Sequence, residues 1–156
     1  MGKEKELLQQ IINKKEVRIS VRSLCFHDGK LLVQRPNDDP NACYGTIGGK
    51  LELGESMEER ICKEYAEETN ARVISAKYLF VIENRFRYGG GLVHGIEHFF
   101  LVDLDTYEIE SCVSYLAQHW LPVDRLIEYD LRPHILRDAI ADGYWRQIKH
   151  LIVSFK

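Results

Sequence analysis

The chain has 156 residues, of which 45% are hydrophobic and 29% charged, and this length and composition are typical of one globular domain. Its 21 Lys and Arg residues against 24 Asp and Glu residues give a net charge of −3, which argues against a nucleic-acid partner. No apolar run approaches the ~20 residues that span a bilayer, and we see no signal peptide and no CxxC pair, so we expect a cytoplasmic protein with no membrane partner.

The first third of the chain is expected to form a short helix followed by a β-hairpin. Residues 3–13 carry apolar side chains at helical spacing, which predicts an amphipathic helix. Residues 17–26 change to the alternating, β-branched pattern of a strand, and Asp28-Gly29 predicts a tight turn into a second strand at residues 31–33. The turn-rich segment at residues 36–44 is expected to be a loop.

A helix is expected from Ser56 to about Thr69, with a signal at each end. Ser56 followed by Glu59 is a capping box, in which both side chains accept hydrogen bonds from backbone N–H groups at the start of the helix. Asn70 is expected to close the helix, because Asn tolerates the left-handed backbone conformation that often follows a last turn.

Strand patterns dominate the rest of the chain. Two long β-like stretches, residues 72–88 and 93–105, are separated by consecutive glycines. A short helix near residues 124–129 and another from Pro133 follow, while residues 150–155 fit either a last strand or the end of that helix. Helices between hairpin-linked strands predict an α/β fold in which helices cover a central mixed sheet.

Three glutamates of the 56–69 helix have unusual positions relative to its apolar side chains. The apolar stripe consists of Met57, Ile61, Cys62 and Tyr65. At about 100° per residue, Glu64 and Glu68 fall beside this stripe and Glu67 falls at its edge. Carboxylates one turn apart on an inward face repel each other and lose hydration unless a cation joins them. Oxygen ligands of this kind suit Mg²⁺ or Mn²⁺.

The same glutamates also fit a surface role, in which Arg60 pairs with Glu64 and Lys63 pairs with Glu67. Helical spacing alone gives this interpretation and the metal-binding one equal weight. The pattern of the wider segment favours metal binding.

Residues 48–71, GGKLELGESMEERICKEYAEETNA, resemble the Nudix box, G-x5-E-x7-R-E-U-x-E-E-x-G-U, where U is a bulky aliphatic residue. Gly49 matches the opening glycine, Glu55 the first glutamate, and the segment from Lys63 to Glu68 the R-E-U-x-E-E core, without a gap. Three positions depart from the pattern: Lys63 replaces arginine, Tyr65 an aliphatic residue and Asn70 glycine. Lysine keeps the charge but loses the bidentate fork of arginine, so a modest loss of rigidity is expected.

The resemblance covers most of residues 17–140 and implies a fold and an activity. It implies one Nudix hydrolase domain over residues 1–156, an α/β/α sandwich with a central mixed sheet, to which residues 1–14 add a helical extension. It also implies metal-dependent hydrolysis of the diphosphate linkage in a nucleoside diphosphate joined to another group X, with Mg²⁺ or Mn²⁺ as cofactor. The substrate is then a small molecule, and family habit favours a homodimer.

The resemblance assigns catalytic and metal-binding roles within the box. Glu64, Glu67 and Glu68 are the expected metal ligands, and one of them could also act as general base. The carbonyl of Gly49 is a further candidate ligand, because glycine permits close approach of the backbone. Glu55 is expected to brace the preceding loop through Lys63 rather than bind metal.

Candidates outside this core are Glu97, Arg35 and Glu52. Glu97 is the candidate catalytic base, because it shares strand parity with the apolar Phe99 and Leu101; a solvated position near the start of the strand is the equally weighted alternative. Arg35, beside the 36–44 loop, could hold a phosphate. Glu52 could contact substrate or reach a metal.

Two other function classes remain open on the sequence. A Nudix-type module could bind or sense a nucleotide without cleaving it, but such modules typically lose glutamates of the box, and all four are present here. An acidic-helix interaction protein with no metal site would not require the spacing from Gly49 to Glu68. The identity of group X is not encoded in the box, because specificity depends on loops outside it.

Overall fold

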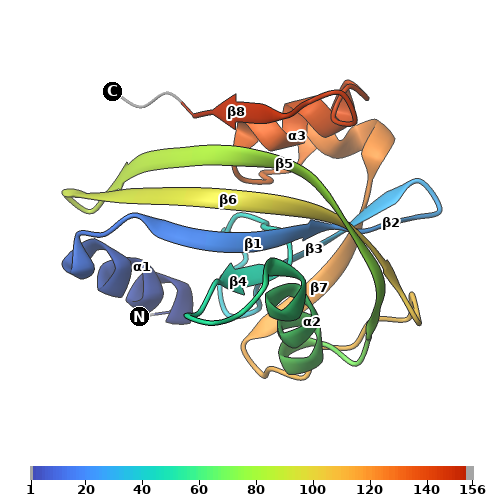
Figure 1. The fold of residues 1–156 in the computed structure, drawn as a ribbon, viewed down its shortest axis with the longest axis horizontal. Helices are drawn as coiled ribbons and strands as arrows, with labels where there is room; N and C mark the ends of the chain where they lie inside the picture. Colours follow the sequence, from blue (N-terminus) through green and yellow to red (C-terminus); the bar gives the residue numbers. More distant parts are fainter. Residues whose placement is uncertain (1, 154–156) are drawn as a thin grey trace.

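A computed structural model, which describes residues 2–153, contains a large mixed sheet at its centre (Figure 1). The strand order is β4-β1-β6-β5-β8; β1 is parallel to β6 and β5 to β8, while the other pairs are antiparallel. The five strands are β1 (Arg18–Leu24), β4 (Gly48–Lys50), β5 (Val73–Tyr88), β6 (Gly91–Leu104) and β8 (His150–Ile152). For residues 150–155 the sequence left open a last strand or the end of a helix. Residues 150–152 form a strand, and residues 154 and 155 lie outside the described part.

A smaller antiparallel sheet contains β2 (Phe26–His27), β3 (Lys30–Pro36) and β7 (Leu116–Pro122), in the order β2-β3-β7. The expected hairpin is confirmed, because Asp28 and Gly29 link β2 to β3 with φ values of 51° and 71°. Positive φ at both central residues is the geometry that a two-residue hairpin turn requires, and Asp-Gly adopts it readily.

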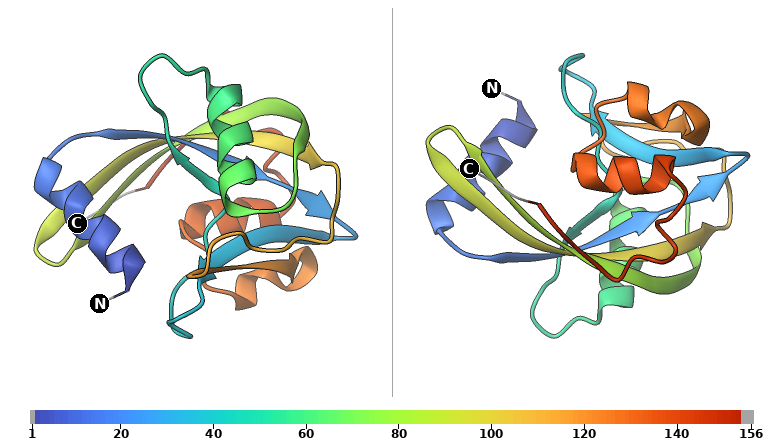
Figure 2. Two further views of the ribbon diagram at one scale, coloured as in Figure 1. Left: turned by 90° about the horizontal axis from the view of Figure 1, so that it is seen from below. Right: turned by 90° about the horizontal axis from the view of Figure 1, so that it is seen from above.

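The helices are α1 (Lys3–Lys14), α2 (Met57–Glu68), the 3₁₀ helix η1 (Val123–Glu128) and α3 (His134–Ala141). Views from opposite sides show α2 over one face of the large sheet and α3 over the other (Figure 2). The expected α/β/α sandwich with a central mixed sheet is confirmed. No helix in residues 2–153 is long and apolar enough to cross a membrane.

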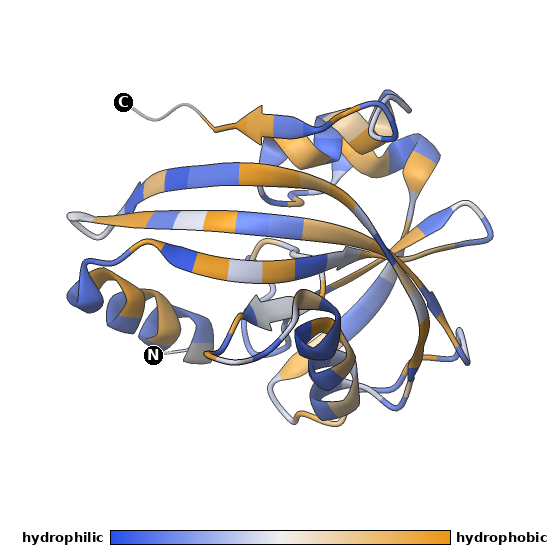
Figure 3. Cartoon of the chain, viewed as in Figure 1, coloured by the Kyte–Doolittle hydropathy of each residue, from blue (hydrophilic) through white to orange (hydrophobic). Residues whose placement is uncertain are grey.

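Two apolar clusters hold these layers together. Ile61 and Tyr65 of α2 pack with Val21 of β1 on one face. Leu136 of α3 belongs to a second cluster with Phe99 of β6. The central strands alternate apolar and polar residues, while α2 is largely hydrophilic on its visible side (Figure 3), as expected for elements buried on only part of their surface.

Two local expectations for α2 are wrong. Cys62 is exposed, because the buried stripe is centred on Ile61 and Tyr65 and includes the charged Arg60 and Glu64 instead. The helix ends at Glu68 without a left-handed residue.

The residues after α2 are fixed by contacts with a distant segment. The amide of Asn70 donates to the carbonyl of Glu108 at 3.0 Å and accepts from the backbone N–H of Glu110 at 2.8 Å. These two bonds make Asn70 a link between α2 and the segment before β7. This role was not visible in the sequence, because the partners are 38 and 40 residues away.

Candidate active site

The side chains of Glu64 and Glu68 lie together on successive turns of α2. Glu64 is buried, and burial raises its pKa. Burial also raises the pKa of Glu68, to about 7, against the opposing effect of a hydrogen bond from Gln34 Nε2 to Glu68 Oε2 at 3.0 Å. The negative charge of Glu64 raises the pKa of Glu68 further, while the positive charges of Arg60 and Arg22 act in the opposite direction on Glu64.

Arg60 is a buried cation among the carboxylates, and the sequence analysis named it only in the surface-pair alternative. Its Nε lies 3.3 Å from Glu64 Oε1, its Nη1 3.5 Å from Glu55 Oε1, and its Nη2 3.4 Å from Glu67 Oε1. The side chain is only 9% exposed, so its charge acts on these partners with little screening by solvent. Of the two ion pairs that the surface alternative expects, the one between Arg60 and Glu64 is therefore present, but it is buried rather than exposed.

The loop before α2 is fastened to the helix by Glu55. Lys63 Nζ donates to Glu55 Oε2 at 2.8 Å, and the backbone N–H of Glu52 donates to Glu55 Oε1 at 2.9 Å. The hydrogen bond from Lys63 is the main cause that holds the pKa of Glu55 below its usual value. Ser56 caps the helix by accepting from Glu59 N at 3.1 Å. The side chain of Glu52 itself points to solvent.

Gly49 brings the backbone of β4 directly against the carboxylate of Glu64. A methyl group built at Gly49 would collide with that carboxylate, so no larger residue fits here without moving Glu64. This close approach is consistent with the expected role of the Gly49 carbonyl as a metal ligand, because only glycine lets β4 and α2 come so near.

We expect Gly49→Ala to lower the free energy of unfolding by about 1–3 kcal/mol, the usual cost of inserting a methyl group into a packed site. Urea denaturation followed by circular dichroism would measure the loss. Gly45→Ala is the matched control, because a methyl group at Gly45 meets nothing within 4 Å. Equal stability of the two variants would contradict the close packing of Glu64 on β4.

Glu97 lies on β6 opposite Ser20 of β1, and its Oε2 accepts a hydrogen bond from Asn84 Nδ2 at 3.1 Å. Because successive residues of a strand alternate faces, Glu97 lies on the face opposite Val21, which packs on α2. Its link to the α2 carboxylates is electrostatic. Burial and the charge of Arg22 lower the pKa of Arg18, while Glu97, Glu64 and Glu52 all raise it.

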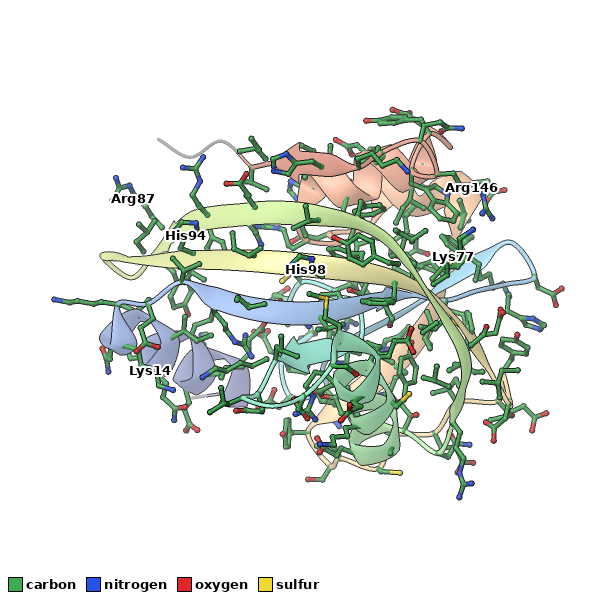
Figure 4. All side chains as sticks on the ribbon, viewed as in Figure 1. Lys14, Lys77, Arg87, His94, His98 and Arg146 are labelled. Carbon is green, nitrogen blue, oxygen red and sulfur yellow. The ribbon has the colours of Figure 1, made fainter. Side chains whose placement is uncertain are left out.

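The remaining candidates lie farther from the paired carboxylates. The Arg35 guanidinium stacks over the Tyr44 ring at 4.5 Å and donates to the carbonyl of Pro40 at 3.3 Å, so it braces the loop after β3. The side chain of Glu67 is 63% exposed and turned toward Arg60. His98, a weaker candidate labelled in Figure 4, pairs with the Tyr78 hydroxyl at 2.9 Å. Gln34 could not be identified from the sequence, because it is 34 residues from Glu68 and belongs to no motif.

The donor set at Glu64 and Glu68 fits a hard divalent cation. Within residues 2–153, no three His, Cys, Asp or Glu side chains are close enough together to form a complete metal site, because Glu67 is turned outward. Glu64 and Glu68, however, are two neighbouring acidic oxygen donors whose pKa values are raised by burial, so Glu68 in particular binds a proton readily when no metal is present. A cation such as Mg²⁺ or Mn²⁺ would take the place of that proton, and carboxylate oxygens are the ligands it prefers.

The raised pKa of Glu68 makes a specific prediction for the metal-free protein. The folded value, about 7, lies above the ordinary value of 4.5, so the folded state keeps a proton that the unfolded chain has released. The free energy of unfolding should therefore fall as pH rises from about 4.5 to 7. In EDTA, Glu68→Gln should be more stable than wild type by ~2 kcal/mol at pH 8 and show little gain at pH 5.

Thermal denaturation of both proteins across this pH range would test the prediction. Glu58→Gln, an exposed position on the same helix, is the control and should not change the pH dependence. A difference between Glu68→Gln and wild type that does not vary with pH would contradict the raised pKa of Glu68.

Three comparisons relate the chain to known proteins. A family model described as NUDIX domain matches residues 16–142. A MutT NUDIX hydrolase from Burkholderia pseudomallei is 24% identical, with 83% of this chain and 99% of that one covered at a TM-score of 0.64. A MutT protein from Bacillus halodurans is 17% identical, with 87% of each chain covered and a TM-score of 0.68. An ADP-ribose pyrophosphatase from Streptococcus suis is 16% identical, with 90% and 100% covered and a TM-score of 0.62.

At these identities the solved structures show a shared fold. Among curated proteins, none matches the sequence closely enough to count as a relative. The family match begins at residue 16, so α1 lies outside it.

Proposed function

Because this chain belongs to the NUDIX domain family, we propose that it is a metal-dependent pyrophosphohydrolase that cleaves the diphosphate linkage of a nucleoside diphosphate joined to another group X. The observation that carries the proposal is the pair Glu64 and Glu68, two carboxylates whose pKa values are raised by burial, with Glu64 packed against the backbone of Gly49. Fold neighbours described as MutT proteins and as an ADP-ribose pyrophosphatase support a diphosphate-containing substrate.

The reaction is the attack of water on one phosphorus of the diphosphate. A bond forms between the water oxygen and phosphorus, the bridging P–O bond breaks, and the leaving phosphate takes the electron pair. A divalent cation, when bound, would neutralise the diphosphate and lower the pKa of the attacking water. We assign Glu64, Glu67, Glu68 and the carbonyl of Gly49 to hold it. For Glu67 this requires its exposed side chain to turn away from Arg60.

The other residues of the site position these groups or move a proton. Arg60 holds the Glu64 carboxylate in place through a contact of 3.3 Å, and Glu55 with Lys63 fastens the loop before α2 to the helix. Glu97 is the proposed acceptor of the proton from water. Arg35, near the end of β3, and Glu52, in the loop before α2, are proposed to contact the substrate.

The decisive experiment is a hydrolysis screen with Mg²⁺ and Mn²⁺ across dinucleoside polyphosphates, nucleotide sugars, ADP-ribose, oxidised nucleoside triphosphates and coenzymes. Product release detected by mass spectrometry should occur with at least one class, require the metal and stop in EDTA. Tight binding of a nucleotide without turnover would instead support a non-catalytic module. The cytoplasmic location and the homodimer stay predictions from the sequence.

A further inference from the structure

An open groove of about 240 Å³ separates α1 from the edge of the large sheet formed by β1 and β4. Its walls are aliphatic: Leu7, Ile11, Val17, Ile19 and Leu51. Three of these side chains are 45–53% exposed, although they lie in a concavity. Concave surfaces lined by apolar side chains are the usual form of a small-molecule site. The lining contains no aromatic ring, so the groove suits an aliphatic group better than a nucleobase that stacks.

The polar residues of this groove are mainly cationic. Lys14, Arg18 and Lys50 contribute three positive charges against the single negative charge of Glu16. Figure 4 shows Lys14 on α1, whereas Arg18 and Lys50 belong to the sheet. An apolar surface bordered by cations is complementary to a molecule with an apolar group at one end and phosphate at the other.

Ile19 and Leu51, at the sheet side of the groove, lie on the same face of the sheet as Gly49. Ile19 and Leu51 are linked by a backbone hydrogen bond of 3.0 Å, and Val21 pairs with Gly49 one pleat further on. Two residues of a strand span about 7 Å, so the aliphatic wall ends roughly that distance from Gly49, which contacts Glu64. On the other face, Arg18 interacts electrostatically with Glu64.

One wall of the groove is α1, which lies outside the family match. The helix is held at both ends: Ile12 packs against Gly91 at the tip of the β5–β6 hairpin, and Gly2 lies against Asp38 in the loop after β3. Figures 1 and 2 show α1 beside β1, near the loop that leads into α2. The groove is therefore a feature that this chain adds to the shared fold.

We propose that this groove binds group X of the substrate and that X is an aliphatic group attached to the diphosphate, with the cations Lys14, Arg18 and Lys50 along its border. This inference rests on the proposed function. It narrows the substrate class from any nucleoside diphosphate derivative to diphosphates that carry an alkyl, acyl or isoprenoid-like chain.

Calorimetric binding of octyl diphosphate and methyl diphosphate in EDTA tests the groove without requiring hydrolysis. Each fully buried methylene strengthens binding roughly fourfold, so partial burial of the longer chain should make octyl diphosphate bind at least about 30-fold more tightly. Val17→Asp should reduce the ratio of the two affinities to near one. The variant should fold, because Val17 is 53% exposed. Ile127→Asp, at a position on η1 that is 57% exposed and outside the groove, should leave the ratio unchanged.

Equal affinity for the two diphosphates in wild type would overturn the inference, as would an octyl preference that Val17→Asp does not reduce. A second measurement compares hydrolysis of the octyl and methyl esters of ADP. An octyl preference in binding without hydrolysis of any diphosphate would support the groove and contradict the proposed function. A second copy of this chain is the other possible occupant of the groove, and sedimentation velocity tests for it. A wild-type dimer that Val17→Asp converts to a monomer would make this face an interface between copies and overturn the inference.

Discussion

Replacing Glu68 with Gln, or Glu64 with Gln, is expected to lower kcat at least about a hundredfold while leaving the fold intact. Amide oxygens bind hard cations much more weakly than carboxylates do, whereas the size of the side chain hardly changes. Gln at position 68 can still meet Gln34, and Gln at position 64 can still pack beside Gly49. The loss should therefore appear in turnover and in metal affinity, and not in the circular dichroism spectrum.

Steady-state kinetics on the best substrate of the screen, with Mg²⁺ varied, would measure this effect. Glu58→Gln is the matched control, because it removes the same charge from an exposed position of α2 and should retain activity within a factor of a few. Near-normal turnover in both Glu64→Gln and Glu68→Gln would exclude the assignment of these residues as metal ligands.

Glu97→Gln is expected to lower kcat by about two to four orders of magnitude, the usual contribution of a positioned proton acceptor. Its metal dependence should change little, because the glutamates of α2 remain. The position of Glu97 makes the test informative, since it lies on β6 on the face of the sheet opposite α2, and Arg18 interacts electrostatically with both Glu97 and Glu64.

Measuring kcat against metal concentration for this variant separates three roles. Partial recovery at high Mg²⁺ or Mn²⁺ would make Glu97 a metal ligand, and activity within a factor of a few would make it a bystander bonded to Asn84. In the latter case the base must be sought within the box or at Glu108 and Glu110. Glu83→Gln, on the neighbouring strand and paired with His150, is the control for loss of a carboxylate from the sheet.

Lys63 stands where the family pattern has arginine, and Arg60 on the same helix makes forked contacts that lysine cannot make. Lysine makes one contact with Glu55, whereas the guanidinium of Arg60 reaches Glu55, Glu64 and Glu67 with three different nitrogens. The forked geometry that lysine lacks is thus supplied one turn earlier on α2. We expect these contacts of the buried arginine to offset the loss of rigidity that lysine brings at position 63.

Features that depend on neighbours in the chain were predictable from the sequence. The Asp28-Gly29 turn forms because both residues tolerate positive φ, and Ser56 caps α2 because its hydroxyl lies beside the N–H of Glu59. The pairing of Glu64 with Glu68 follows from helical spacing, which places residues four apart on one face. The family and the α/β/α sandwich followed from the spacing of the box, and both are confirmed.

Contacts between distant segments were decided only by the tertiary structure. Gln34 of β3, the central strand of the smaller sheet, reaches Glu68 of α2, and the exposed Glu67 side chain contacts the buried Arg60. Asn70 bonds to the segment before β7 instead of closing the helix by its own conformation. The groove beneath α1 likewise depends on packing against β1, because periodicity shows that a helix is amphipathic but not which surface it covers.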